Sequence, residues 1–363
     1  MERKDKNHQF PAEFWKALAE AGFHGMVIPE KYGGSGLGML EMALAMDTLA
    51  AEGCGLAGPG MLVLTAVMAS LAITKYGSEY LKEKYLPKIA KGEFEFCIGI
   101  TEPDAGTNTL NTKTFARKEE DGSYTINGQK IFISGADHAN GIILVTRTTP
   151  LEKAPKKTFG ISLFVIDLPN PSIEAIPIEK HGLNYINSCE VYLSDVRVPK
   201  ENLLGEEGKG WYYLLDMLNP ERISFAAACT GTGMIAIKKA VEYARERNVF
   251  GVPIGRYQAI QFPLAEAKAK IEAARLMTCK AAKLYDEGKP CGAETNMAKV
   301  AAVEAGTQAV YHAMQTFGGY GYAVEYDVER WWREINLVRL APVTQQMALA
   351  FIGERVLGLP RSY

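Results

Sequence analysis

The spacing of hydrophobic positions changes twice along the 363 residues of the chain. Apolar residues recur with helical spacing from Pro11 to about Ala90 and again from Gly205 onwards. Between Phe94 and Val198 the chain consists of short segments rich in β-branched and aromatic residues, separated by turn residues. We therefore expect an α+β multidomain protein: a helical N-terminal domain (1–93), a middle antiparallel β-barrel domain (94–204) and a C-terminal four-helix bundle (205–363).

Local patterns give more detailed expectations. A helix is predicted from Pro11, with Gly22 as its C-terminal cap. The dipeptide Asn127-Gly128 favours a hairpin turn. Four apolar stripes after Gly205 predict four long amphipathic helices. The third stripe contains Met297, Val300 and Ala301, and the fourth contains Met347, Phe351 and Val356.

Composition removes several classes of function. The formal net charge of −2 argues against nucleic-acid binding, which needs a surplus of cations facing phosphates. The most apolar stretch, Met61–Ile73, is too short to span a bilayer, and the first ten residues lack an apolar signal region, so we expect a cytoplasmic protein. The six cysteines are scattered without histidines at ligand spacing, which predicts neither disulfides nor a metal site.

The most informative motif is CIGITEPDAGTNT at 97–109. It has the composition of a strand that ends in a turn rich in Gly and Thr, where hydroxyl and backbone N–H groups meet a polar ligand. Taken alone, an ordinary exit from a strand explains it better.

The segment TEPDAGTN resembles the signature turn of the acyl-CoA dehydrogenase family. The resemblance continues, in the family's order, through GMVIPEKYGGSG at 25–36, NGQKIFISGADHAN at 127–140, GKGWYYLLDMLNPERI at 208–223, ERNVFGVPIGRYQAIQ at 246–261 and MQTFGGYGY at 314–322. It implies FAD as cofactor, an acyl-CoA substrate oxidised between its α and β carbons, an electron-transferring flavoprotein as electron acceptor, and a homotetramer. Family members usually carry one more helix before the Pro11 segment, so we expect the first helix to be missing here.

The resemblance implies roles for residues of the β region. Thr101 matches a hydroxyl that bonds the flavin ring, and Thr107 a hydroxyl near the acyl-CoA chain. Phe132 stands where relatives pack a Trp on the flavin, and Ser134 where a Thr bonds near its reactive nitrogen. Without the resemblance, Phe132 and Ser134 are two residues on one face of a strand whose other face carries Ile131 and Ile133.

Further residues match positions that contact FAD from the helical region. Arg247 and Phe250 match an RxxFG motif whose Arg meets the FAD pyrophosphate across a subunit interface. Gln258, Gln315 and Gly319 match contacts to the adenosine half, and Thr344 and Gln346 match contacts to the flavin. The simpler alternatives are that Arg247 is a cation at a helix C-terminus and that Gly318-Gly319 ends a helix.

The catalytic base is where the chain departs from most relatives. Their C-terminal Glu is replaced by Pro342, whereas a minority of the family carries the base on a bundle helix, just before an Arg. That place reads Glu221-Arg222, so Glu221 is the candidate base and Arg222 is expected beside the CoA portion. The structural alternative is a helix start with Asn219 as N-cap and Pro220 in the first position.

Pro342 also lacks the backbone N–H that helps relatives hold the thioester oxygen, and losing one such donor costs about 3 kcal/mol. Two alternatives therefore stay open. One is an enoyl-CoA reductase of the crotonobetainyl-CoA reductase type, a subgroup that also lacks the C-terminal Glu. The other is a flavin-binding family member without dehydrogenase activity.

Overall fold

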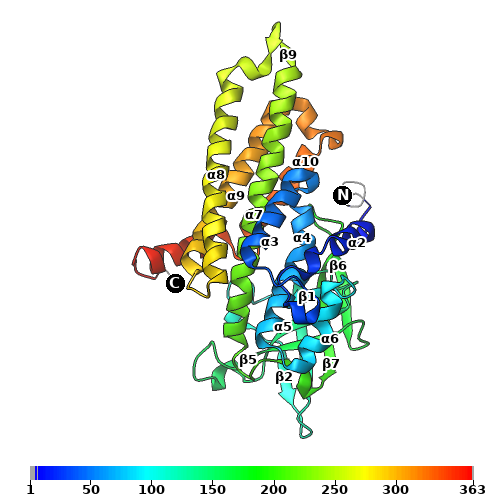
Figure 1. Ribbon diagram of the computed structural model, residues 1–363. Helices are drawn as coiled ribbons and strands as arrows, with labels where there is room; N and C mark the ends of the chain where they lie inside the picture. Colours follow the sequence, from blue (N-terminus) through cyan, green and yellow to red (C-terminus); the bar gives the residue numbers. More distant parts are fainter. Residues whose placement is uncertain (1–4, 6, 362–363) are drawn as a thin grey trace. The chain divides into compact units, whose positions relative to one another are not determined.

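The computed structural model describes residue 5 and residues 7–361 (Figure 1). Two compact units divide the chain. The β unit comprises Leu62–Leu218 and the N-terminal segment up to Leu37. The helical unit comprises Gly38–Met61 and the chain from Asn219 onwards. The boundaries predicted at residues 93 and 204 follow secondary structure and stay a prediction.

The β unit is built on one mixed sheet. Its strands are β1 (Phe96–Gly99), β2 (Phe115–Lys118), β3 (Tyr124–Ser134), β4 (Gly141–Arg147), β5 (Ile161–Asp167), β6 (Ile173–Ile178), β7 (Ser188–Val198) and β8 (Leu203–Leu204). The order is β6-β7-β3-β2-β4-β5-β8, with β1 beside β4. The prediction of an antiparallel domain needs correction, because β4 pairs in parallel with both β1 and β2. This path through the described strands does not close, so the barrel stays unconfirmed.

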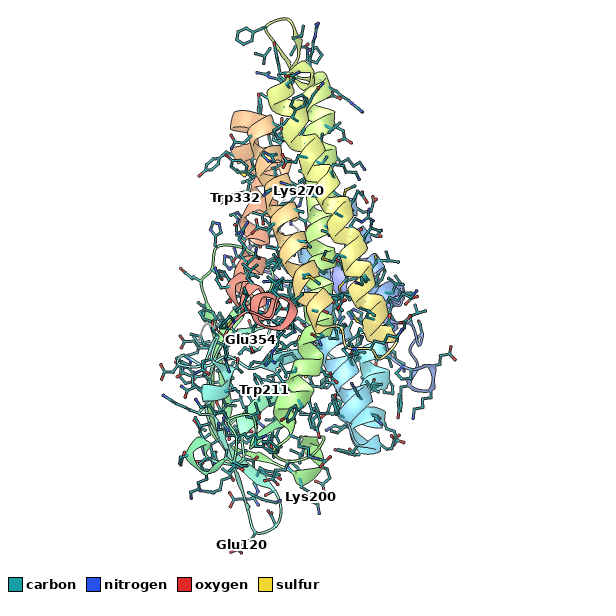
Figure 2. All side chains as sticks on the ribbon, turned by 90° about the vertical axis from the view of Figure 1, so that its left-hand side faces the viewer. Glu120, Lys200, Trp211, Lys270, Trp332 and Glu354 are labelled. Carbon is teal, nitrogen blue, oxygen red and sulfur yellow. The ribbon has the colours of Figure 1, made fainter. Side chains whose placement is uncertain are left out.

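The hairpin predicted at Asn127-Gly128 is wrong. Both residues lie inside β3, and the turn joining β2 to β3 lies at residues 119–123, with Glu120 at its tip (Figure 2). The pairing of β3 with β7 shifts register at this dipeptide. Gly128 has φ 154°, and a Cβ there would lie 2.6 Å from the Thr114 hydroxyl oxygen. The glycine therefore permits a β-bulge and a close approach of the backbone at Thr114.

Helices of the β unit include α2 (Ala12–Glu20), α5 (Ser70–Tyr76) and α6 (Glu79–Ala90). The helix predicted from Pro11 is confirmed: Trp15 and Leu18 are buried, and Gly22 follows with φ 82°. The apolar run around Met61 is longer than predicted, because it lies in the helical stretch Ala57–Tyr76. Its 20 residues pass a membrane-span test by length and hydropathy, but 78% of the tested window is buried inside the structure, as in the core helix of a folded domain.

Three long helices dominate the helical unit: α7 (Gly210–Glu246), which enters it from the β unit, α8 (Gln258–Asp286) and α9 (Gly292–Phe317). Over the unit they run side by side in Figure 1. The expected fourth long helix is instead a series of short ones, namely α10 (Val328–Ile335), α11 (Leu337–Leu340) and α12 (Gln345–Phe351), of which α10 and α12 pack on α9. The helix α3 (Met39–Leu49) packs on α8, and its first two N–H groups donate to the carboxylate of Asp286 at 2.7 and 2.9 Å.

Two predicted apolar faces are misplaced. Met297, Val300 and Ala301 are only half-buried, and the face of α9 that is buried carries Ala298, Lys299, Ala302 and Val303. Phe351 and Val356 of the fourth stripe are exposed. The apolar pattern of α9 indicated the wrong face because Lys299, a charged residue, lies on the buried one.

The structural alternative of a helix start at Asn219 is not what the structure shows. Pro220 lies inside α7, so Glu221 and Arg222 are in the interior of a continuous helix. Glu221 therefore has no first-turn N–H groups to stabilise its charge.

Candidate active site

The β unit brings Thr101 next to β3. The N–H of Ile131 donates to the Thr101 carbonyl at 2.9 Å, so Thr101 lies beside the strand that carries Phe132 and Ser134. Ser134 pairs with Ser188 at the end of this strand. Thr107 lies farther along the loop after β1 and is exposed. Three of the four residues predicted for this region are thus grouped at one end of β3.

Phe132 has two unusual properties for an aromatic residue in a strand. Its side chain is 64% exposed, and its φ of 60° lies in the left-handed region. The pairing of β3 with β7 shifts register between Lys130 and Ile133, which breaks the simple alternation expected for this strand. A non-glycine residue held at positive φ costs on the order of 1–3 kcal/mol and is characteristic of functional sites. An exposed ring beside two hydroxyl-bearing residues suits a planar ligand such as a flavin.

In the helical unit, Glu221 is a buried carboxyl with little solvation. Its side chain is buried, and its Oε2 atom has no hydrogen-bond partner among the described residues. Burial raises the pKa of Glu221 to about 8, against the opposing effect of the positive charges of Arg222 and Lys299. A carboxyl whose pKa lies near neutrality, with an oxygen left available, is suited to exchange a proton with a substrate.

Arg222 is held by amide oxygens. Its guanidinium donates to Oδ1 of Asn296 on α9 and to Oδ1 of Asn219, each at 2.8 Å. Burial lowers the pKa of Arg222, and the charge of Glu221 acts in the opposite direction. The two asparagines thus fix the direction of the cation next to the candidate base.

The segment that contains Pro342 is tied to α9. The ammonium of Lys299 donates to the Val343 carbonyl at 2.5 Å. Glu304, also on α9, accepts from Arg339 at 2.8 Å and from the side chain of Gln345 at 2.6 Å. Thr344 is the N-cap of α12, where its hydroxyl accepts from the N–H of Met347. Gln346 follows in α12 and is exposed.

The remaining predicted residues lie at the other end of the bundle. Arg247 follows α7, and Phe250 occupies the turn between β9 (Asn248–Val249) and β10 (Val252–Pro253) with φ 54° and 93% exposure. The hairpin is labelled at β9 in Figure 1. Gln258 begins α8, and the Tyr257 hydroxyl donates to the Val249 carbonyl at 3.2 Å.

Gln315 and Gly319 belong to the same end. The ring of Phe317, between them, stacks on Tyr243 of α7 with 4.4 Å between centroids. Gln315 is exposed on α9, and Gly318, with φ 60°, ends that helix, as one of the simpler alternatives proposed. Arg247, Phe250, Gln258, Gln315 and Gly319 therefore form one group, which is separate from Glu221 and Arg222.

The distance between these groups follows from helix geometry. At 1.5 Å per residue, Glu221 lies about 38 Å along α7 from Glu246, the residue before Arg247. That is farther than one dinucleotide cofactor spans. A dinucleotide cofactor that reaches Glu221 therefore cannot also contact Arg247 of the same chain.

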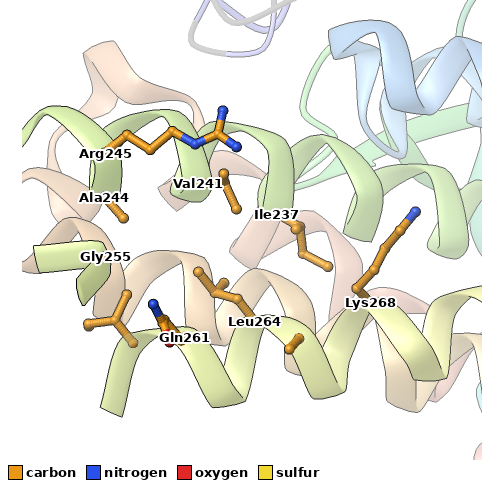
Figure 3. Close-up of a pocket in the computed structure, with 10 residues that line it drawn as sticks. Ile237, Val241, Ala244, Arg245, Gly255, Gln261, Leu264 and Lys268 are labelled. Atoms are coloured by element: carbon orange, nitrogen blue, oxygen red, sulfur yellow. The ribbon is translucent and has the colours of Figure 1, made fainter. Parts of the chain in front are cut away.

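A pocket of about 350 Å³ opens between α7 and α8, close to the hairpin (Figure 3). Its lining is mostly aliphatic, with Arg245, Gln261 and Lys268 as polar members. None of the predicted site residues lines this pocket. Across residues 5 and 7–361, no group of three or more His, Cys, Asp or Glu side chains is arranged to hold a metal ion.

Sequence profiles of three domains cover most of the chain. The N-terminal, middle and C-terminal domains of acyl-CoA dehydrogenase match residues 1–93, 97–196 and 208–357. The chain belongs to the acyl-CoA dehydrogenase family. This membership agrees with the observed order of a helical region, a β region and a helical region, and it makes the protein an oxidoreductase that acts on CH–CH bonds.

Individual relatives extend over nearly the full length. Acyl-CoA dehydrogenase FadE12 of Mycobacterium tuberculosis is 40% identical over 99% of this chain and 92% of the relative. A 3-(aryl)acrylate reductase of Clostridium sporogenes is 34% identical over 95% of this chain and 91% of its own. Among solved structures, the FAD complex of PigA is 29% identical, with a TM-score of 0.92 over 98% of this chain and 91% of PigA.

FAD is the cofactor of this acyl-CoA dehydrogenase family member, and the residues present suit it. Phe132 offers an exposed ring, Thr101 and Ser134 offer hydroxyls, and Arg247 offers a planar guanidinium for a pyrophosphate. Sequence reasoning missed Asn296 and Lys299. Asn296 and Lys299 are polar residues in a helix otherwise rich in alanine, and they lie on its buried face. This pattern could have identified them as candidates for the site.

Proposed function

We propose that the protein is an FAD-dependent acyl-CoA dehydrogenase in which Glu221 removes the α proton of an acyl-CoA thioester. The observation that carries the proposal is the buried Glu221 carboxyl, whose Oε2 atom has no hydrogen-bond partner among the described residues. Burial raises the pKa of this carboxyl to about 8, which agrees with that role. Glu221 occupies the place of the helix-borne base of some relatives, in a chain whose C-terminal position for that base is Pro342.

The reaction removes two hydrogens. The α C–H bond breaks and its proton passes to the Glu221 carboxylate, while the β C–H bond breaks and a double bond forms between the two carbons. FAD, when bound, supplies the acceptor for the hydride at its N5 atom. Arg222, fixed by Asn219 and Asn296, provides positive charge next to the base, where it counters the effect of burial and favours the carboxylate form.

The proposed function requires residues from a second copy of the chain. Because about 38 Å of α7 separates Glu221 from the Arg247 group, Arg247 and Phe250 serve the FAD of a neighbouring subunit, in keeping with a homotetramer. Electrons then leave to an electron-transferring flavoprotein. The proposed setting is the cytoplasm.

The second candidate is an enoyl-CoA reductase that runs the same chemistry in reverse. Two observations favour it: a reductase stands among the relatives, and Pro342 lacks the N–H that would help stabilise enolate charge. In this direction Glu221 delivers the α proton, which its raised pKa also suits.

Anaerobic mixing of the purified holoenzyme with a panel of acyl-CoA and enoyl-CoA thioesters tests the function. Bleaching of the oxidised flavin by saturated thioesters supports the dehydrogenase. Reoxidation of the reduced flavin by enoyl-CoAs, without bleaching by any saturated thioester, supports the reductase. Bound FAD that responds to no thioester contradicts both and favours a flavin-binding protein without this activity.

A further inference from the structure

Two buried cations lie beneath the loop that follows β1. The loop carries Thr101 and Thr107, and most of its middle part is exposed. Lys130, from β3, is 0% exposed, and Arg147, at the end of β4, is 2% exposed. Neither residue belongs to the candidate site described above, and both make hydrogen bonds to this loop.

Lys130 holds the start of the loop. Its ammonium donates to the Ile100 carbonyl at 3.0 Å and to Oε1 of Glu102 at 2.8 Å, the residues on either side of Thr101. Glu102 in turn accepts from the N–H groups of Lys113 at 2.6 Å and Thr114 at 3.0 Å. Three backbone segments are therefore tied together around Thr101.

The same contact reaches the exposed phenylalanine. Lys130 precedes the irregular step of β3 that places Phe132 at positive φ, and the N–H of Ile131 donates to the Thr101 carbonyl at 2.9 Å. The Lys130 ammonium thus binds the residues on either side of Thr101, and the backbone of Lys130 lies two residues before Phe132 in β3. Burial lowers the pKa of Lys130 to about 8, opposed by the charge of Glu102.

A buried ion pair is weak evidence for a gain in stability, because desolvation of the two charges offsets their attraction. The Lys130–Glu102 pair is almost completely buried, with side-chain exposures of 0% and 5%. Apolar residues of similar volume would fill the same space with no desolvation of charge. We therefore attribute to the pair the role of fixing the positions of the backbone groups that it binds.

Arg147 holds the far end of the loop. Its Nη2 atom donates to the Leu110 carbonyl at 2.7 Å and to the Lys157 carbonyl at 3.0 Å, and its Nη1 atom donates to the Phe159 carbonyl at 3.0 Å. The backbone N–H of Arg147 donates to the Thr114 carbonyl at 2.8 Å. The guanidinium therefore fixes the turn that comes three residues after Thr107.

We propose that Lys130 and Arg147 are positioning residues for two different ligands. Lys130 fixes the positions of Thr101 and Phe132 for binding the flavin, and Arg147 fixes the position of Thr107 for binding the acyl-CoA. The inference rests on the proposed function. Loss of Lys130 should weaken FAD binding, and loss of Arg147 should weaken acyl-CoA binding. A general role of both residues in folding would not separate these two effects.

Three variants of the holoenzyme test the flavin part: Lys130→Met, the double variant Lys130→Met/Glu102→Gln, and the surface control Lys118→Met on β2. The double variant removes both buried charges and is expected to recover most of the thermal stability lost in Lys130→Met. We expect its dissociation constant for FAD to remain at least tenfold above wild type, with a shifted flavin absorption spectrum. If FAD affinity and spectrum recover together with stability, Lys130 is only structural and the proposal fails.

Arg147→Lys tests the acyl-CoA part, with Arg117→Lys, an exposed residue of β2, as its control. We expect Arg147→Lys to raise KM for acyl-CoA at least fivefold while the FAD dissociation constant stays within twofold of wild type. Equal losses of FAD and acyl-CoA binding overturn the division of roles, and so does an unchanged KM. If no thioester reduces wild-type flavin, the proposed function fails, but the FAD titrations still decide the role of Lys130.

Discussion

The ammonium of Lys299 donates to the carbonyl oxygen of Val343 at 2.5 Å, one residue past Pro342. Lys299 lies on the buried face of α9. Its positive charge lowers the pKa of Glu221 and so opposes the rise that burial causes. One side chain therefore connects the segment where most relatives carry their base with the residue that we propose as the base here.

Replacing Lys299 by Met should affect both partners. The Val343 carbonyl loses its donor, which destabilises the protein by about 1–3 kcal/mol, and the Glu221 pKa rises further because a neighbouring positive charge is gone. Thermal unfolding and the pH dependence of flavin reduction measure the two effects. Lys280→Met, an exposed position on α8, is the control. A lower melting temperature with an unmoved pH midpoint would mean that Lys299 acts on the segment alone.

Glu221→Gln should keep FAD bound and slow flavin reduction by a saturated acyl-CoA by about 10²–10⁴-fold, because the amide cannot accept the α proton. Glu242→Gln, on an exposed position of α7, is the matched control and should react at the wild-type rate. Anaerobic stopped-flow spectroscopy at saturating thioester gives both rates. A Glu221→Gln variant that reduces its flavin at near the control rate would falsify the assignment of the base.

The pH profile follows from the state of the same carboxyl. Dehydrogenation needs the Glu221 carboxylate, and burial raises the pKa of this group to about 8. For the free enzyme, kcat/KM should therefore rise with pH and level off above about 8. The reverse reaction needs the protonated acid, so its kcat/KM should fall over the same range. A dehydrogenation profile that is flat between pH 6 and 9 would contradict a base with this pKa.

Stability should depend on Glu221 in the opposite sense to dehydrogenation. Its folded pKa of about 8 lies above the ordinary value of 4.5, so the folded protein keeps a proton that the unfolded chain releases. The resulting stability is fully present below pH 4.5 and is lost as pH rises towards 8. Near pH 7 the loss is on the order of 3 kcal/mol. Glu221→Gln should therefore match wild type in melting temperature near pH 5 and exceed it near pH 8. Equal melting temperatures of the two proteins at both pH values would argue against a buried carboxyl with a raised pKa.

The spacing of apolar residues predicted the order of the regions, because helical and strand patterns report local structure. The shared neighbourhood of Thr101 and Phe132 was implied by the family resemblance and not by the pattern of residues. That pattern misplaced features that depend on distant partners. Asn127-Gly128 has the composition of a hairpin turn, yet pairing with β7 keeps it inside a strand as a bulge. Asn219-Pro220 also allowed a helix start as the alternative to a catalytic Glu221, yet α7 continues through Pro220. Lys299 is polar, so no apolar pattern could assign it to a buried face.

A complementation experiment tests the assignment of Arg247 to a neighbouring subunit. Arg247→Ala should weaken FAD binding by about 10–100-fold, since a charged hydrogen bond to a phosphate contributes on the order of 1.5–3 kcal/mol. At FAD concentrations that fill only wild-type sites, this variant and Glu221→Gln should each be inactive. Co-expressed, they form mixed oligomers in which one chain supplies Glu221 and its neighbour supplies Arg247. We expect flavin reduction by acyl-CoA to reappear in these mixed oligomers and not when the separately purified variants are combined without exchange. If the mixed oligomers stay inactive, Glu221 and Arg247 of one chain serve the same FAD, and the assignment of Arg247 to a neighbouring subunit is wrong.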